Sequence, residues 1–185
     1  MIEAVLDADV IYPLPLRDTL LSAAVEGCFR PLWSERILDE AISNLIADKR
    51  ATPESADRMR AALRAHFEDS FVEGHEARIG EMPNHPKDRH VAACAAEAKA
   101  GIIVTSNLND FQKLPDGIKA VSPDEFLTEL MIEHSDRMRA ALIAQSSRLK
   151  REPISVAQLL ELLKPVAPGF VAIFSAIHPD LAKRT

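Results

Sequence analysis

The chain lacks the features that mark several large classes of protein. Only 5% of its 185 residues are aromatic, and it has 6 glycines and 2 cysteines. No apolar run reaches the roughly 18 residues of a membrane span, and the glycines form no nucleotide-binding pattern. Cys28 and Cys94 stand among apolar residues, without the spacing of a metal site or a disulfide framework. These absences argue against a membrane protein, a disulfide-stapled domain and a nucleotide-binding enzyme.

The N-terminal segment lacks the basic residues of a secretory signal. It is apolar but carries Glu3 and Asp7, so we do not interpret it as a cleaved leader. Together with the two isolated cysteines, this predicts a cytoplasmic protein. Hydrophobic residues make up 47% of the chain, and with few aromatics the core must be built from Ala, Leu, Ile and Val. Such a composition predicts a helix-rich chain of one domain, or one domain with an appendage.

Charge is unevenly spread along the chain, whose net charge is −6. Residues 1–134 carry 14 basic and 24 acidic side chains, whereas residues 135–185 carry 8 and 4. A negative balance argues against unaided binding to nucleic acid. An acidic centre can still meet a phosphate group if divalent cations lie between them.

Strand-like and helix-like segments alternate through the first 134 residues. Apolar or β-branched runs predict strands at residues 3–6, 29–33, 70–73, 102–105 and 118–121. The pattern favours an α/β domain with a mostly parallel sheet, and its ligand site should lie beyond the carboxyl ends of the strands. Residues 135–185 show helical periodicity alone. We therefore predict a domain at 1–134 and a C-terminal helical extension at 135–185.

Acids and amides follow two of the predicted strands. Asp7 and Asp9 come directly after the first strand, and Asn107 and Asp110 follow the strand at 102–105. Each has an ordinary explanation as a turn or capping residue. The same holds for two acids in the helical segments between these strands. Asp88 can cap a helix, and Glu40 can be a solvated helix acid.

Periodicity does not distinguish Glu40 from its neighbour Asp39. Taken together, however, the acids form a pattern that suits a metal site. Three or four carboxylates hold Mg²⁺ or Mn²⁺ because hard cations prefer oxygen ligands, and such a cluster repels itself without metal. Two cations about 4 Å apart can activate water and stabilise the leaving oxygen of a phosphodiester.

Several segments resemble the PIN-domain nucleases. Residues 5–10 resemble their opening strand, and residues 17–18 and 30–40 resemble a subgroup that includes toxins of the VapC type. Residues 88–93, 104–111 and 123–127 match later motifs of the family. The matches cover about residues 1–130 and occur in the family's order.

The resemblance implies a three-layer α/β/α sandwich whose acidic pocket binds Mg²⁺ or Mn²⁺ and cleaves RNA. It selects Glu40 rather than Asp39, and by motif position the catalytic, metal-binding residues are Asp7, Glu40, Asp88 and Asp110. Supporting pocket residues are Asp9, Asn107, Thr105 and Ser106. The hydroxyls of Thr105 and Ser106 are expected to orient the last acid. The resemblance also implies a cognate antitoxin protein and a homodimer.

The loop before the third acid departs from the family pattern. The family usually has Asp-Pro-Asp-Asp there, whereas this chain has Asn84-His85-Pro86-Lys87-Asp88. Asp88 is then the one carboxylate in the loop, and a cation stands beside it. The departure argues against a second metal position more than against the first.

The sequence leaves two other functions open, and it contains one further candidate surface. The Asp7-x-Asp9 pattern also resembles the nucleophile strand of haloacid-dehalogenase-type phosphohydrolases, although their closing acidic pair is missing. A PIN-like fold can alternatively serve as a non-catalytic scaffold.

Beyond the matched region, Arg148, Lys150 and Arg151, with Arg137 and Arg139, are candidates for contacting RNA phosphate. A solvated helix face is the alternative for these basic residues.

Overall fold

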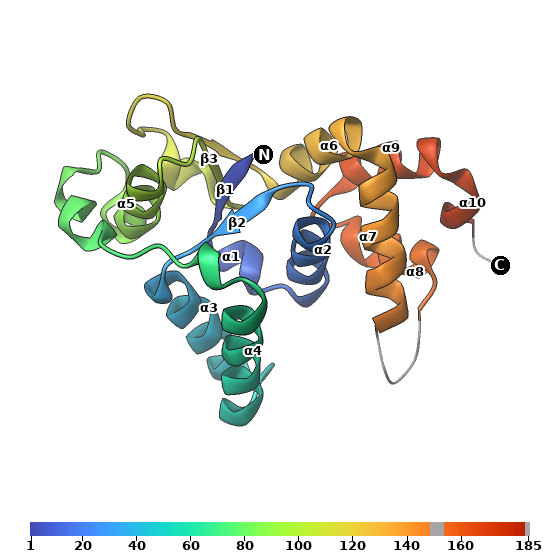
Figure 1. The fold of residues 1–185 in the computed structure, drawn as a ribbon, viewed down its shortest axis with the longest axis horizontal. Helices are drawn as coiled ribbons and strands as arrows, with labels where there is room; N and C mark the ends of the chain where they lie inside the picture. Colours follow the sequence, from blue (N-terminus) through green and yellow to red (C-terminus); the bar gives the residue numbers. More distant parts are fainter. Residues whose placement is uncertain (149–153, 184–185) are drawn as a thin grey trace. The chain divides into compact units, whose positions relative to one another are not determined.

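The computed structural model describes residues 1–148 and 154–183 (Figure 1). Its contacts divide the chain into two compact units. The sheet unit comprises Glu3–Tyr12 and Pro31–Val121, and the helical unit comprises Met1–Ile2, Pro13–Arg30 and the chain from Ser122 onward. The boundary predicted between residues 134 and 135 stays a prediction, since compactness does not test which part folds independently.

A four-stranded sheet lies at the centre of the sheet unit. Its strands are β1 (Glu3–Leu6), β2 (Arg30–Leu32), β3 (Ile102–Val104) and β4 (Lys119–Val121), in the order β2-β1-β3-β4. β3 pairs in parallel with both β1 and β4, so that Leu6, Val104 and Val121 share one level. These three residues are nearly inaccessible to solvent. The predicted α/β class with a parallel sheet is confirmed.

The strand expected at residues 70–73 is wrong. Here the structure has one isolated bridge, between Trp33 and Phe71. A 3-10 helix, η1 (Glu68–Ser70), precedes the bridge, and Gly74 follows with a left-handed φ of 81°. The backbone is therefore turning on both sides of Phe71, which leaves no room for a continuous ladder.

Helices of the sheet unit bring the acidic segments to the strand ends. α1 (Ala8–Ile11) follows β1 directly, and α3 (Glu35–Ala47) packs against α1. Ser34 begins α3 because its side chain accepts a hydrogen bond from the amide of Ile37 at 3.3 Å. α5 (Arg89–Ala98) packs against β1 and β3 through residues that are small or β-branched and fully buried. The short helices η3 (Pro86–Asp88) and η4 (Leu108–Phe111) carry the later acids.

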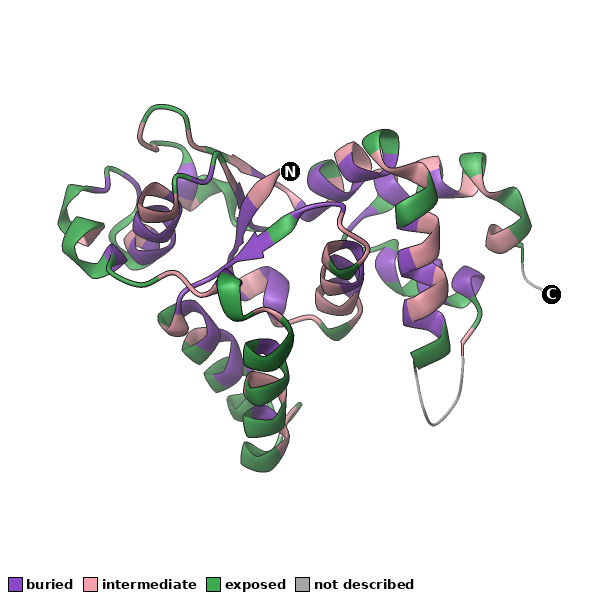
Figure 2. Ribbon diagram, in the orientation of Figure 1, coloured by how far each residue is buried: buried purple, intermediate pink, exposed green. Residues whose placement is uncertain are grey.

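Two further helices of this unit lie away from the strand ends. α4 (Pro53–His66) is mostly exposed, with Ala56 and Leu63 as its buried residues (Figure 2). η2 (His75–Glu81) packs against α5. Neither helix contributes a side chain to the acidic pocket described below.

The helical unit has its own apolar core. Its helices are α2 (Leu14–Val25), α6 (Pro123–Glu133), α7 (Ser135–Arg148), α8 (Val156–Leu163), α9 (Pro168–Ile177) and α10 (Pro179–Ala182). α2 packs on α7, and α6 packs on α9. The rings of Phe29 and Phe126 meet edge to face at 4.9 Å, and Phe170 and Phe174 are fully buried. Among the described residues, no helix has both the length and the apolarity needed to cross a membrane.

Candidate metal centre

The parallel pairing of β1 and β3 places Asp7 beside Thr105. The amide of Asp7 donates to the carbonyl of Val104 at 3.1 Å, which extends the ladder by one residue. At this level the Thr105 hydroxyl donates to Oδ2 of Asp7 at 2.8 Å. Asp7 also caps α1, since its Oδ1 accepts from the amide of Ala8 at 2.7 Å. Both explanations of Asp7, helix cap and pocket acid, therefore hold at once.

Asp9 is held by the same turn after β3. Its carboxylate accepts from the amide of Ser106 at 2.9 Å and lies 3.3 Å from the Thr105 hydroxyl. The Thr105 hydroxyl thus donates to Asp7 and Asp9 rather than directly to Asp110, and the expected role of the two hydroxyls in orienting the last acid stays a prediction. The Thr105 hydroxyl and the Ser106 amide hold Asp7 and Asp9, because parallel register puts them beside the end of β1. Asp110 is instead held by Asn107, whose side-chain amide donates to Oδ2 of Asp110 at 2.5 Å.

Glu40 and Asp39 point to different partners. Glu40 lines the acidic pocket, and its side chain is 33% exposed. The carboxylate of Asp39 is 63% exposed and pairs with the guanidinium of Arg60 at 2.5 Å. The geometry therefore places Glu40 in the pocket and Asp39 on the surface.

A buried histidine backs Glu40. Nδ1 of His90 lies 3.1 Å from the carbonyl of Lys87, so this nitrogen carries the proton. Its Nε2 lies 3.5 Å from Oε2 of Glu40, and the His90 side chain is 2% exposed. Burial lowers the pKa of His90. The buried imidazole therefore lies beside the Glu40 carboxylate and limits the positions that this carboxylate can take.

Asp88 occupies the N-cap position of α5 without acting as a cap. Its side chain makes no capping hydrogen bond, and the residue is only 6% exposed. Within the described part of the chain, its buried Oδ2 accepts no hydrogen bond. The capping explanation of Asp88 therefore fails, and a carboxylate oxygen is left for another ligand.

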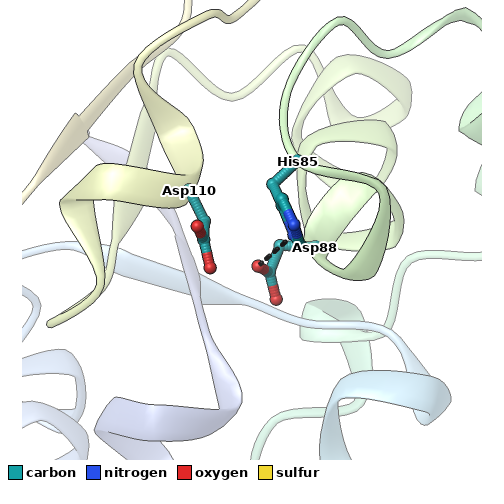
Figure 3. A group of neighbouring side chains, drawn as sticks. All are labelled: His85, Asp88 and Asp110. Carbon is teal, nitrogen blue, oxygen red and sulfur yellow. Dashed lines mark ion pairs between the residues drawn. The ribbon is translucent and has the colours of Figure 1, made fainter.

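Asp110 lies on the other side of Asp88, together with a residue that the sequence patterns left without a role. Ligand atoms of His85, Asp88 and Asp110 all lie within 4.8 Å of one another (Figure 3). Asp110 does not line the pocket that holds Asp7 and Glu40. The structure thus brings Asp7, Asp9, Glu40 and Asp88 around one hollow, and places Asp110 next to Asp88 outside it.

The acidic pocket has a volume of about 350 Å³. It is lined by Asp7, Ala8, Asp9, Tyr12, Glu40, Asn44, Asp48, Lys87, Asp88 and Asn107. Sequence reasoning missed Tyr12, Asn44, Asp48 and Lys87. Helical spacing was an available signal for two of them, since Asn44 and Asp48 follow Glu40 at intervals of four residues. The Tyr12 hydroxyl donates to Oδ2 of Asp48 at 2.6 Å, which fixes the aromatic ring at the pocket wall.

Burial and mutual repulsion dominate the ionisation of these acids. Burial, followed by the charge of Asp9, raises the pKa of Asp7 to about 7. Burial also raises the pKa of Asp9 to about 6. For Asp88 the pKa is raised by burial and by the carboxyl of Asp110, whereas the Asn107 amide lowers the pKa of Asp110. Keeping Asp7 and Asp9 ionised at neutral pH therefore costs free energy that a bound cation would offset.

The donor set fits a hard divalent cation. The carboxylates of Asp7, Asp9, Glu40 and Asp88 line one pocket, Asp7 and Asp88 are buried, and Asp88 has an oxygen that accepts no hydrogen bond from the described residues. Mg²⁺ and Mn²⁺ take carboxylate oxygens and retain some water.

Comparison with known proteins gives matches to both units. A PIN-domain family model matches residues 3–109, and a VapC50 C-terminal domain model matches residues 123–176. A Mycobacterium tuberculosis protein named "Putative ribonuclease VapC50" is 33% identical over 114 residues, which cover 60% of this chain and 68% of that protein. No solved structure matches the chain significantly.

These matches confirm the resemblance stated from the sequence motifs. The PIN-like α/β/α fold with C-terminal helices is confirmed as well. The PIN match begins at β1 and ends within η4, so it contains every acid of the pocket. The chain belongs to the PIN-domain family.

Proposed function

We propose that this chain is a divalent-cation-dependent endoribonuclease and the toxin of a toxin–antitoxin pair. The observation that carries the proposal is the convergence of Asp7, Glu40 and Asp88 in one pocket at the carboxyl ends of β1 and β3. The similarity to the Mycobacterium tuberculosis protein named as a ribonuclease supports it. A PIN fold alone would not, because a fold hosts many functions and the site decides among them.

Asp7, Glu40 and Asp88 would hold Mg²⁺ or Mn²⁺ in the pocket, and Asp110, which lies next to Asp88 outside the pocket, would contribute from that side. A bound cation lowers the pKa of a water molecule and polarises the phosphodiester. Thr105 and Ser106 keep Asp7 and Asp9 at fixed positions through their hydrogen bonds. No separate general base need be invoked.

The pocket wall suits an RNA strand. Lys87 stands at the pocket beside Asp88, where an ammonium group can pair with a phosphate oxygen. Tyr12 presents an aromatic ring, and Arg50 lies over it with its guanidinium carbon 5.2 Å from the ring centre. Unpaired RNA bases are commonly bound by stacking on aromatic rings and guanidinium planes.

The basic residues of α7 and of the chain just beyond it remain a proposed RNA contact. The Arg148 guanidinium donates to the hydroxyl of Ser22 at 2.6 Å, which holds it against α2. Arg137 donates to the carbonyl of Gly27 at 2.8 Å, and Arg139 lies 3.6 Å from Asp180. Lys150 and Arg151 lie outside the described residues. A cognate antitoxin, a homodimer and a cytoplasmic location stay predictions.

Cleavage of total cellular RNA by the purified full chain tests the proposal. The reaction is run with Mg²⁺ or Mn²⁺, with EDTA, and with the Asp7→Asn variant. We expect cleavage that needs the cation and is lost in the variant, while circular dichroism shows a folded protein.

Calorimetric titration with Mn²⁺ separates the alternatives. A folded protein with neither cleavage nor Mn²⁺ binding would favour the scaffold function. Hydrolysis of phosphomonoesters without cleavage of RNA would favour the phosphohydrolase function. In that case the Asp7-x-Asp9 pattern serves a different reaction.

A further inference from the structure

His85 stands where the family's loop usually has acids, and it faces Asp110. Figure 3 shows His85 and Asp88 side by side on one loop, with the Asp110 carboxylate opposite them. Nδ1 of His85 lies 3.9 Å from Oδ2 of Asp88. Ligands of an ion bound at about 2.1 Å lie up to about 4.2 Å apart, so the 4.8 Å limit on the three ligand atoms needs little contraction. His85 can supply it, because its side chain is 55% exposed.

Backbone hydrogen bonds hold these three residues together before any ion binds. The amide of His85 donates to the carbonyl of Asp110 at 3.1 Å, and the amide of Asp88 donates to the carbonyl of His85 at 3.0 Å. The first bond links two segments that are 25 positions apart in the sequence. A site whose backbone is already in place costs less ordering entropy on binding than one formed from free loops.

The buried oxygen of Asp88 is the second observation that indicates a ligand. Asp88 is 6% exposed, and its Oδ2, the atom nearest to His85, accepts no hydrogen bond within the described residues. A buried carboxylate oxygen without a donor is costly. A cation between Asp88, His85 and Asp110 would remove that cost.

We propose that His85, Asp88 and Asp110 hold a second divalent cation, and that the imidazole ligand makes this position prefer Mn²⁺ to Mg²⁺. Asp88 is shared with the pocket of Asp7 and Glu40, so the two cations are neighbours. Nitrogen is a softer donor than carboxylate oxygen, and Mg²⁺ keeps to oxygen ligands and water. The inference deepens the proposed function and rests on it for the identity of the first cation.

This assignment reverses the conclusion drawn from the loop sequence alone. The loss of acids before Asp88 argues against a second cation if carboxylates are the ligands considered. The structure shows that His85 lies within reach of both remaining acids. The loop has then exchanged an oxygen ligand for a nitrogen ligand, which changes the ion that it prefers.

Titration of the metal-free full chain with MnCl₂ and, separately, MgCl₂ tests the proposal. Both titrations are run in the same buffer at about pH 8, because a metal ion and a proton compete for the same imidazole nitrogen. In His85→Ala we expect Mn²⁺ affinity at one position to fall about tenfold or more, with Mg²⁺ affinity nearly unchanged. Pulsed EPR of the Mn²⁺-loaded wild type should show coupling to an imidazole ¹⁴N nucleus, and His85→Ala should lose it.

His66→Ala is the matched control. His66 is exposed on α4 of the same unit, and its ring bonds the carbonyl of Ala62 at 2.9 Å. This variant should keep the wild-type Mn²⁺ affinity and the ¹⁴N coupling.

Two results would overturn the proposal. One is an absence of ¹⁴N coupling in the wild type, which needs no variant to fold. The other is a His85→Ala variant that binds both ions as tightly as the wild type or more tightly. That outcome would show that His85 is not a ligand of the cation. Cleavage of RNA with Mg²⁺ is measured in parallel, so failure of the nuclease function is seen separately from failure of the second position.

Discussion

The Thr105 hydroxyl donates a 2.8 Å hydrogen bond to Oδ2 of Asp7, although the two residues are 98 positions apart. The bond exists because β1 and β3 pair in parallel with Leu6 opposite Val104. It joins the first acid of the pocket to the strand that leads to the last acid. Thr105 is fully buried, so water cannot replace its hydroxyl.

Replacing Thr105 by Val should weaken cation binding. Val keeps the shape of Thr but leaves Asp7 without this donor, and losing a hydrogen bond to a buried charged group costs about 1.5–3 kcal/mol. We expect Mn²⁺ affinity to fall about tenfold in calorimetric titration. Thr105→Ser retains a hydroxyl and should stay near the wild type. Equal affinities of the Val and Ser variants would show that the hydroxyl does not position Asp7.

The metal-free protein should lose stability from Asp7 as the pH rises toward neutrality. Its pKa is raised from 3.8 to about 7 in the fold, so the folded state binds this proton more tightly than the unfolded state. The contribution is complete below about pH 4 and is lost as the pH rises through 7. Urea unfolding in EDTA should therefore show a stability difference between wild type and Asp7→Asn that changes in favour of the variant from pH 5 to 8. A difference in unfolding free energy between the two proteins that does not change with pH would contradict the raised pKa.

Adding Mn²⁺ should reverse this trend in the wild type. The cation binds the ionised carboxylates, so its stabilisation grows as the pH rises. Asp7→Asn should gain much less stability from Mn²⁺ at pH 8. An equal gain in both proteins would place the cation away from Asp7.

Substitutions of Glu40 and of its neighbour Asp39 should differ sharply in their effect on RNA cleavage. Glu40→Gln removes a charged oxygen ligand from the pocket, and we expect RNA cleavage to fall by about tenfold to 100-fold. Asp39→Asn removes a surface pair with Arg60, which is worth at most about 1 kcal/mol, and should leave cleavage unchanged. Cleavage rates and melting temperatures of the two variants check this. Loss of cleavage in Asp39→Asn alone would exchange their roles.

Asp124 should stabilise the helical unit by capping α9 from α6. Its carboxylate accepts from the amides of Phe170 at 2.8 Å and Gly169 at 3.1 Å. Asp124→Ala should cost about 1 kcal/mol, which lowers the melting temperature by roughly 2–4 °C for a chain of this size. A Cβ atom at Gly169 would meet Oδ2 of Asp124 at 2.9 Å. Gly169→Ala should therefore destabilise the wild type more than it destabilises Asp124→Ala, and equal effects would show that the carboxylate is not in the way.

The basic residues at and beyond the end of α7 should affect the salt dependence of RNA binding if they contact phosphates. In an Asp7→Asn background, neutralising Arg148, Lys150 and Arg151 together should weaken binding and reduce the slope of affinity against salt concentration. Arg78→Gln is a suitable control, because Arg78 pairs with Glu97 on the surface of the sheet unit. An unchanged slope in the triple variant would leave these residues as a solvated surface.

Local signals in the sequence were enough to predict most elements. Ser34 and the apolar spacing after it predicted α3, and the β-branched run at 102–105 predicted β3, which the structure has at Ile102–Val104. Such signals act over a few residues, so they are legible without a tertiary structure. The wrong strand prediction at residues 70–73 also came from a local signal, because strand propensity does not show whether a partner strand is within reach.

The choice among acids was different in kind. Periodicity left Asp39 and Glu40 equivalent, and the family resemblance selected Glu40. The tertiary structure supports the same choice independently, because the guanidinium of Arg60 on α4 donates a hydrogen bond to the carboxylate of Asp39. The capping explanation of Asp88 also needed the structure, because a cap is defined by where the side chain points.

The sequence by itself determined the α/β alternation, the helical C-terminal part, the PIN resemblance and the set of acids. Only the tertiary structure decided that Thr105 holds Asp7, that Tyr12 and Asp48 form the pocket wall, and that His85 faces Asp110. These relationships join segments tens of residues apart, and they follow from the register of parallel strands and the packing of α3 and α5. Residue types and local spacing do not determine that register, so no sequence motif could predict these contacts.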